Sequence, residues 1–223
     1  MLVRIPLGLI LYNDGNMISF IYFDLGGVVI DDFSGNTKWD ELKTELGINE
    51  TNVEKFQQLW STYSPQLCTT LSTEDLLSIL QQELNLVFRD NYSLLSGFVD
   101  RFEANPSILP VLEFAKQHAR LGLLTNMYIG MFDAIQRLNI LPGIEWDTVL
   151  DSSIEGLEKP DRRFFELATE RADAQSGDIL FIDNTQEHID AARALGWNTY
   201  FYDANDHQAS SAQLLEYLRK TFA

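Results

Sequence analysis

Short apolar segments recur along this chain, and amphipathic helical patterns lie between them. The apolar segments, the third weaker than the rest, are Ile18–Phe23, Leu121–Leu124, Thr148–Leu150, Ile179–Ile182 and Thr199–Tyr202. The helical patterns are Pro110–His118, Phe132–Leu138, Arg162–Arg171, His188–Leu195 and Ala212–Thr221. Strands that alternate with helices in this way are joined by right-handed crossovers and form parallel sheets. The pattern therefore predicts an α/β fold whose parallel sheet has helices on both faces.

One long segment, residues 33–105, has no convincing strand and only helical patterns. These patterns are Trp39–Leu46, Val53–Trp60, Thr73–Leu84 and Tyr92–Phe102. Ser72 stands just before the third of them, in the position of a helix N-cap. The apolar face of that helix would consist of Leu76, Leu77 and Leu80. We expect residues 33–105 to form an α-helical cap domain, inserted into a core made of residues 17–32 and 106–223.

Residues 1–16 precede the first predicted strand. They carry one positive charge, a short apolar stretch interrupted by Pro6, and no small-residue cleavage site. We expect an N-terminal extension here, with a weak signal peptide as the alternative.

The charge of the chain limits its partners. Lys and Arg number 16 and Asp and Glu 33, so the net charge is −17. Such an acidic surface repels phosphate backbones and anionic lipids, so we expect neither a nucleic acid nor a membrane as a partner. The single cysteine, Cys68, cannot form an internal disulfide, which fits a reducing cytoplasm. We expect a cytoplasmic monomer or homodimer.

Carboxylates follow two of the predicted strands. Asp24 ends the first strand and is followed by Gly26 and Gly27, and Asp183 ends the fourth. Ligands of parallel sheets bind at the carboxyl ends of the strands, where glycines let a ligand approach the backbone. Two carboxylates at this edge form the oxygen-rich setting that Mg²⁺ prefers, although each one alone is also an ordinary turn residue.

Two further strand ends carry groups that bind anions. Thr125 and Asn126 follow the second strand and offer a hydroxyl and an amide. Lys159 precedes Pro160, which favours the start of a helix, and a helix N-terminus attracts anions. A lone lysine is usually a solvated surface charge. Only the residues around Lys159 in the sequence indicate a functional role for it.

Together, these four motifs resemble the haloacid dehalogenase-like hydrolase superfamily from about residue 17 onward. The strongest element is Gly156–Asp161 with Phe164 and Phe165 behind it. It is followed by Asp183, 24 residues after Lys159, and by Ala191–Gly196. The resemblance implies a Rossmann-like core and a helical cap.

The resemblance also implies roles for the residues at the strand ends. Asp24 would be the nucleophile that forms an aspartyl-phosphate, and Lys159 would neutralise charge on the nucleophile and the phosphoryl group. The catalytic residues would be Asp24, Thr125, Asn126 and Lys159. The substrate-binding residues would be Gly27, Thr125, Asn126 and Lys159. The ligands of Mg²⁺ would be Asp24, the carbonyl of Gly26, Asp183 and Asn184.

The chain departs from the family pattern at two positions. Most phosphatases of the family have a second aspartate two residues after the nucleophile, where this chain has Gly26. That aspartate protonates the leaving oxygen, and such general acid–base help is worth about 10²–10⁴-fold in rate. Asp31 and Asp32 lie nearby in sequence, and we expect them to be residues of the hinge to the cap. Asn184 stands where many members have an acidic metal ligand.

Three functions agree with these residues. The first is a Mg²⁺-dependent phosphatase of a small phosphorylated metabolite. The second is a 2-haloacid dehalogenase, because a halide leaves without needing a proton. The third is a catalytically impaired member of the family that acts as a binding or regulatory protein.

Other conspicuous residues are expected to be structural. The aromatic residues of the cap, expected to form its own core, are Trp39, Phe56, Trp60, Tyr63 and Phe88. The histidines, expected to be surface or helix residues outside any metal site, are His118, His188 and His207.

Overall fold

The computed structural model describes residues 17–223, and the expected extension at residues 1–16 lies outside the described residues. Its centre is a five-stranded parallel sheet in the order β5-β4-β1-β6-β7. The strands are β1 (Phe20–Phe23), β4 (Arg120–Thr125), β5 (Thr148–Asp151), β6 (Ile179–Asp183) and β7 (Asn198–Phe201). Each predicted strand is present, and the fold class is confirmed.

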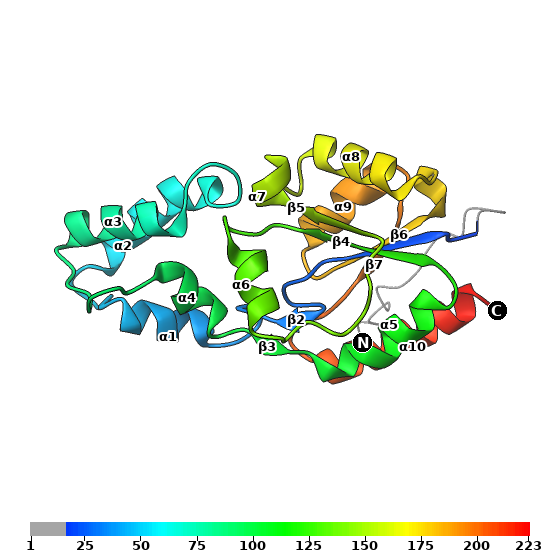
Figure 1. Cartoon of the computed structure of the whole chain (residues 1–223), viewed down its shortest axis with the longest axis horizontal. Coiled ribbons are helices and arrows are strands. Elements are labelled where there is room, and N and C mark those ends of the chain that lie inside the picture. The colour runs from blue at the N-terminus through cyan, green and yellow to red at the C-terminus, as the bar shows by residue number, and fades with distance from the viewer. Residues whose placement is uncertain (1–16) are drawn as a thin grey trace, which may run out of the picture.

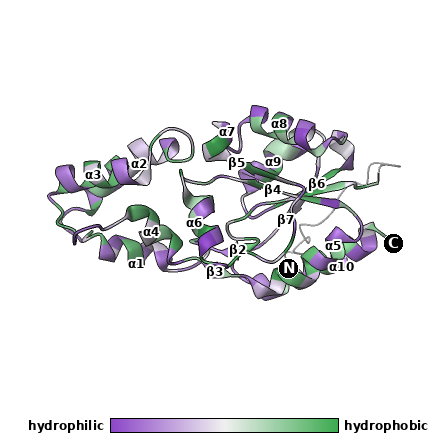
Figure 2. Ribbon diagram, viewed as in Figure 1, coloured by the Kyte–Doolittle hydropathy of each residue, from purple (hydrophilic) through white to green (hydrophobic). Residues whose placement is uncertain are grey.

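Helices cover both faces of this sheet, as Figure 1 shows. One face carries α8 (Arg162–Ala172) and α9 (Gln186–Ala194), and the other carries α5 (Leu109–Lys116) and α10 (His207–Thr221). Alternate residues of β1 point to opposite faces: Phe20 and Tyr22 pack with α8 and α9, while Ile21 and Phe23 pack with α5 and α10. Figure 2 shows hydrophobic residues concentrated along the central strands. Burial on both faces explains why the strands read as continuous apolar runs.

A helical segment extends from one end of the sheet, on the left in Figure 1. The chain leaves the core through β2 (Ile30–Asp31) and returns through β3 (Glu103–Ala104), and these two short strands pair antiparallel. Between them lie four helices, which we call the helical insert: α1 (Lys38–Glu45), α2 (Val53–Tyr63), α3 (Thr73–Leu84) and α4 (Leu94–Val99). The sequence pattern predicted these helices but missed β2 and β3, because strands of two residues are too short to show a periodic pattern.

The expected N-cap of helix α3, Ser72, is confirmed. The Ser72 hydroxyl accepts a hydrogen bond from the Asp75 backbone N–H, and the Asp75 carboxylate accepts one from the Ser72 N–H, which together form a capping box. The remaining short helices are η1 (Ser64–Gln66), η2 (Pro106–Ile108), α6 (Met131–Arg137), α7 (Ser152–Glu155) and η3 (Ser176–Asp178). Among residues 17–223, no helix is long and apolar enough to cross a membrane.

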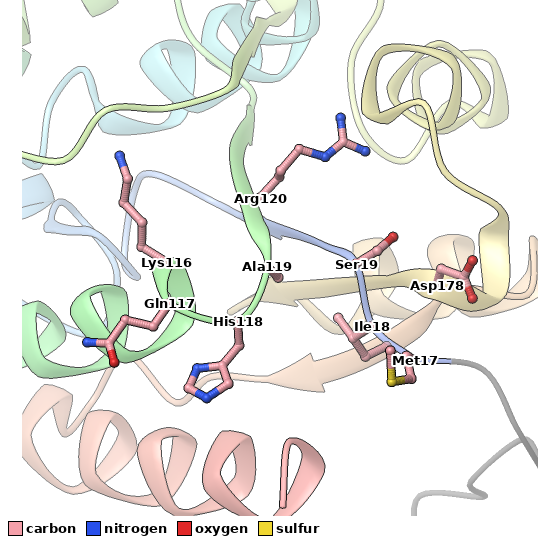
Figure 3. Close-up of a pocket in the computed structure, with 9 residues that line it drawn as sticks. All are labelled: Met17, Ile18, Ser19, Lys116, Gln117, His118, Ala119, Arg120 and Asp178. Carbon is pink, nitrogen blue, oxygen red and sulfur yellow. The ribbon is translucent and has the colours of Figure 1, made fainter.

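A wide depression of about 780 Å³ lies at the amino ends of β1 and β4, far from the strand ends that carry the predicted site. Lys116, His118 and Arg120 contribute to its lining. Their side chains point in different directions in Figure 3 and do not converge on a common point. This depression therefore lacks the grouped polar atoms of a ligand site.

Candidate active site

Two carboxylates and one ammonium meet at the carboxyl edge of the sheet. Asp24 follows β1 and Asp183 ends β6, and the parallel register pairs Phe23 with Ile182, which makes these aspartates neighbours. The Nζ atom of Lys159 lies 2.9 Å from Oδ1 of Asp24 and 2.7 Å from Oδ2 of Asp183. Their exposed fractions are 8%, 0% and 2% for Asp24, Asp183 and Lys159. The structure thus brings these three predicted residues together in one buried ionic cluster.

Asn126 fixes the main chain of Lys159. Its Nδ2 donates to the Lys159 carbonyl at 2.8 Å, and its Oδ1 accepts from the Lys159 N–H, also at 2.8 Å. Both polar atoms of the amide are therefore used to hold Lys159. The geometry gives Asn126 a positioning role, in addition to its place beside Thr125.

Thr125 ends β4 beside β1, and its side chain is completely buried. Its Oγ1 has no hydrogen-bond partner among the described residues. An unpartnered buried hydroxyl costs about 1–3 kcal/mol, so such a group needs an explanation. An oxygen of a bound ligand would satisfy it.

His188 also lies at this site, although the sequence did not predict it there. It lies in the first turn of α9, and its Nδ1 is 3.1 Å from Oδ2 and 3.2 Å from Oδ1 of Asp183. The expectation that no histidine lies at a metal-capable site is therefore wrong for His188. The available signal was its place five residues after Asp183, at the start of the helix that follows the strand.

The charges in this cluster act on one another. Burial, together with the negative charge of Asp183, raises the pKa of Asp24 to about 6 despite the opposing effect of Lys159. Burial also disfavours the ionised form of Asp183, but Lys159 and His188 outweigh it and hold its pKa below the usual range. The same two carboxylates overcome burial at Lys159 and raise its pKa. One ammonium thus faces two carboxylates, which leaves a net negative charge.

This negative, oxygen-rich cluster fits a divalent cation. Ligand atoms of Asp24, Asp183 and His188 all lie within 4.8 Å of one another. Mg²⁺ takes oxygen ligands, so the two carboxylates suit it, whereas His188 is better placed to orient Asp183 by a hydrogen bond. Nδ2 of Asn184 donates to the Ser34 hydroxyl at 3.1 Å, and the amide oxygen remains as a possible ligand.

Gly27 adopts a conformation that other residues disfavour, with φ = 71°. A Cβ at this position would collide with the Asn184 side chain and lie 2.9 Å from the Ser34 hydroxyl. A glycine is therefore needed here to keep Asn184 close to the backbone that follows Asp24.

At Gly26, the space that a side chain would occupy is filled by Asp32. A Cβ on Gly26 would touch Oδ2 of Asp32 and lie 3.1 Å from its Cγ. The other oxygen of Asp32 accepts a hydrogen bond from the Ser34 N–H at 2.8 Å. Burial raises the pKa of Asp32. A carboxyl group is thus present beside Gly26 although position 26 has no side chain.

A cavity of about 400 Å³ opens beside this site, between the core and the helical insert. Gly26, Asp32 and Asn126 are the lining residues that belong to the site or border it. Its remaining lining residues are Ile30, Phe33, Trp39, Trp60, Cys68, Phe98, Phe102, Met127, Tyr128 and Met131.

The aromatic residues of the helical insert divide between two roles. Phe56 is buried and packs against Trp39 and Trp60, as expected of a core residue. The expectation was incomplete for these two tryptophans, because both also line the cavity.

The sheet order, the buried Asp–Lys–Asp cluster and the helical insert over the strand ends together define a class of hydrolytic α/β enzymes. The model of the haloacid dehalogenase-like hydrolase family matches residues 18–196, and the chain belongs to this family.

Relatives include both phosphatases and dehalogenases. The chain is similar to phosphatase MT3486 of Mycobacterium tuberculosis, with 24% identity over 83% of this chain and 88% of the relative. A Bacteroides thetaiotaomicron enzyme of the family, bt-2542, solved with magnesium and inorganic phosphate, has 18% identity and a TM-score of 0.67 over 85% of this chain and 96% of its own. L-2-haloacid dehalogenase of Xanthobacter autotrophicus has 15% identity and a TM-score of 0.58 over 83% of this chain and 78% of its own. Because their sequence identities to this chain are below 25%, these two solved structures show only that the fold is shared.

Proposed function

We propose that this protein is a Mg²⁺-dependent phosphatase that hydrolyses a small phosphorylated metabolite through an aspartyl-phosphate on Asp24. The buried cluster of Asp24, Lys159 and Asp183 carries this proposal. The named phosphatase among the relatives, and the magnesium and phosphate held by the Bacteroides enzyme, support it. We further propose that residues 33–105 act as a cap over a core of residues 17–32 and 106–223, and that the enzyme works in the cytoplasm as a monomer or homodimer.

In the first half of the reaction, a carboxylate oxygen of Asp24 attacks phosphorus as the bond to the leaving oxygen breaks. The Lys159 ammonium, which both carboxylates keep protonated, offsets the charge of the transferring phosphoryl group. The unpartnered Thr125 hydroxyl donates to a phosphoryl oxygen. Mg²⁺, held by Asp24, Asp183, the Gly26 carbonyl and Asn184, would screen Asp24 from its anionic substrate.

Asp32 is the group best placed to supply the proton that position 26 lacks. Its carboxyl fills the space beside Gly26, and its raised pKa favours the protonated form. It gives this proton to the departing alkoxide. In the second half, Asp32 takes a proton from the water that attacks the aspartyl-phosphate, which releases inorganic phosphate and restores Asp24. This role for Asp32 counts against the impaired-protein alternative.

The dehalogenase alternative has weaker support. A halide leaves without a proton, so this reaction gains nothing from Asp32, and it needs no metal. The dehalogenases among the solved neighbours support it through the fold alone.

The test is release of phosphate from a panel of phosphorylated metabolites and p-nitrophenyl phosphate, with Mg²⁺ and with a chelator, beside release of halide from 2-chloropropionate. We expect phosphate release that the chelator abolishes. Metal-independent halide release would establish the dehalogenase, and no turnover in either assay would establish the impaired protein.

A further inference from the structure

We infer that the alcohol released by this enzyme is uncharged and mainly apolar, so that the substrate is the monophosphate ester of an aliphatic or aromatic alcohol. This inference rests on the proposed function and names the substrate class of the same site. It comes from the chemistry of the cavity of about 400 Å³ between the core and the helical insert.

The position of the cavity makes it the compartment for the leaving group. Two of its lining residues, Gly26 and Asn126, lie within two residues of Asp24 and Thr125 along the chain, and the carboxyl of a third, Asp32, lies beside Gly26. The phosphoryl group occupies the ionic cluster. The group bonded to the leaving oxygen must therefore extend away from Asp24, and the cavity is the space that opens there.

The wall of the cavity is apolar. Two tryptophans of the helical insert, Trp39 and Trp60, form part of it, and their ring centroids lie 4.6 Å apart. The core contributes thioether and aliphatic groups from Met127, Met131 and Ile30. An apolar alcohol that enters this space exchanges water for aromatic and aliphatic contacts.

The few polar groups of the wall are uncharged. Burial, with a contribution from Glu158, raises the pKa of the Cys68 thiol to about 12, and burial raises the pKa of the Tyr128 hydroxyl. Both side chains therefore line the cavity in neutral form at physiological pH. They offer a polyhydroxylated sugar few of the hydrogen bonds that it would lose from water.

No cation lines the cavity among the described residues, and the one carboxyl group in its lining is that of Asp32, the proposed proton donor. A second phosphate or a carboxylate on the substrate would lose its hydration here without gaining a cationic partner. Leaving a buried charge unpaired is strongly unfavourable. The cavity thus selects against bisphosphates and phosphorylated acids.

The experiment compares n-alkyl phosphates from methyl to decyl, because their leaving alcohols have nearly equal basicity and the demand for a proton stays constant. We expect kcat/KM to rise by about fourfold for each added methylene until the cavity is full. Glucose 6-phosphate and 3-phosphoglycerate should be poorer substrates than hexyl phosphate.

A matched pair of variants tests whether the cavity causes this selectivity. Trp60→Leu removes an aromatic wall, whereas Phe88→Leu removes a partly buried aromatic of the insert that stacks on Tyr92 outside the cavity. We expect the octyl-to-methyl ratio of kcat/KM to fall about tenfold in Trp60→Leu and to stay unchanged in Phe88→Leu.

The outcomes separate this inference from the proposed function. If phosphate esters are hydrolysed but kcat/KM is flat or falls with chain length, the apolar substrate class is wrong and the phosphatase stands. If no phosphate ester is hydrolysed, the phosphatase proposal fails. The cavity is then assessed by binding of octylphosphonate and methylphosphonate in thermal-shift assays. Stronger binding of the octyl compound, lost in Trp60→Leu, would retain the apolar ligand class, and equal binding would overturn it.

Discussion

The two sides of the site at the sheet edge differ in how they are built. On the core side, Asp24, Lys159 and Asp183 form a charged cluster in which nearly every polar atom has a fixed partner. On the side of the helical insert, the wall consists of large apolar side chains such as Trp39 and Trp60. In the proposed reaction, the first side would act on any phosphoryl group and the second would accept one kind of alcohol. Chemistry and specificity would then be assigned to different regions of the chain.

This division predicts that changes on the core side affect every substrate alike, whereas changes at the cavity affect substrates unequally. The largest effect is expected for Asp24→Asn, because an amide is a poor nucleophile of nearly the same shape. We expect kcat to fall by about 10⁴-fold or more for methyl and octyl phosphate alike, with the melting temperature retained. Phosphate release at close to the wild-type rate would show that Asp24 is not the nucleophile.

Lys159→Ala should be the next most severe change. It leaves two buried carboxylates without their cation, which we expect to lower kcat/KM by about 10³-fold and the free energy of unfolding by about 3–5 kcal/mol. Lys159→Arg should not restore activity, because a planar guanidinium does not replace a point charge between two carboxylates. Steady-state kinetics and urea unfolding measure both effects, and an active Arg variant would contradict this geometry.

Asp32 lies where the two sides meet, and its substitution should discriminate between substrates. In Asp32→Asn, we expect kcat/KM to fall by about 10²-fold for octyl phosphate and by little for p-nitrophenyl phosphate, whose leaving group needs no proton. Asp31→Asn is the matched control, because the neighbouring Asp31 carboxylate pairs with Lys38 at 3.0 Å. An equal loss for both substrates would show that Asp32 does not donate the proton.

Restoring the family's aspartate sharpens the same test. Gly26→Asp alone would place a side chain against Asp32 and should not help. Gly26→Asp combined with Asp32→Ala frees that space, and we expect it to recover part of the activity on octyl phosphate. Kinetics of the single and double variants measure this, and recovery in Gly26→Asp alone would mean that Asp32 moves aside.

The core side should also show a pH-dependent affinity for metal. Burial raises the pKa of Asp24 to about 6, so below pH 6 a proton occupies the carboxyl that Mg²⁺ needs, and above pH 6 no proton has to be displaced. We expect Mg²⁺ to bind about tenfold more weakly at pH 5 than at pH 7.5. Calorimetric titration measures this difference, which should be absent in Asp24→Asn.

The smallest effect is expected for Thr125→Val. The hydroxyl has no partner in the described protein, so its removal should leave the melting temperature unchanged or slightly raised. Binding of inorganic phosphate should weaken by about five- to tenfold, because one donor to the anion is lost. A clear loss of stability without any change in phosphate binding would show that the hydroxyl has a structural role.

The sequence predicted the core side well and the insert side poorly, for a physical reason. Asp24, Thr125 and Asp183 follow buried strands whose pattern is readable, and parallel register brings such strand ends together. His188 was missed although it follows Asp183 closely, because three scattered histidines show no ligand spacing of their own.

The position of the Asp32 carboxyl beside Gly26 depends on the path of the chain after β2, and no hydrophobic pattern in the sequence predicts that path. Phe56 and Trp60 are four residues apart in α2, so the helical pattern places them on the same face and does not distinguish them. Only the packing of the folded chain makes Phe56 a buried core residue and places Trp60 at the cavity.

The antiparallel pairing of β2 with β3 has a mechanical consequence. Asp32 directly follows β2, the strand through which the chain passes into the helical insert. The Asp32 carboxyl beside Gly26 is therefore connected along the chain to the helices that carry Trp39 and Trp60. In the proposed reaction, a substrate that displaced these helices from the core would also displace Asp32 from the leaving oxygen. Proton transfer as well as binding would then discriminate against a substrate that fits the cavity badly.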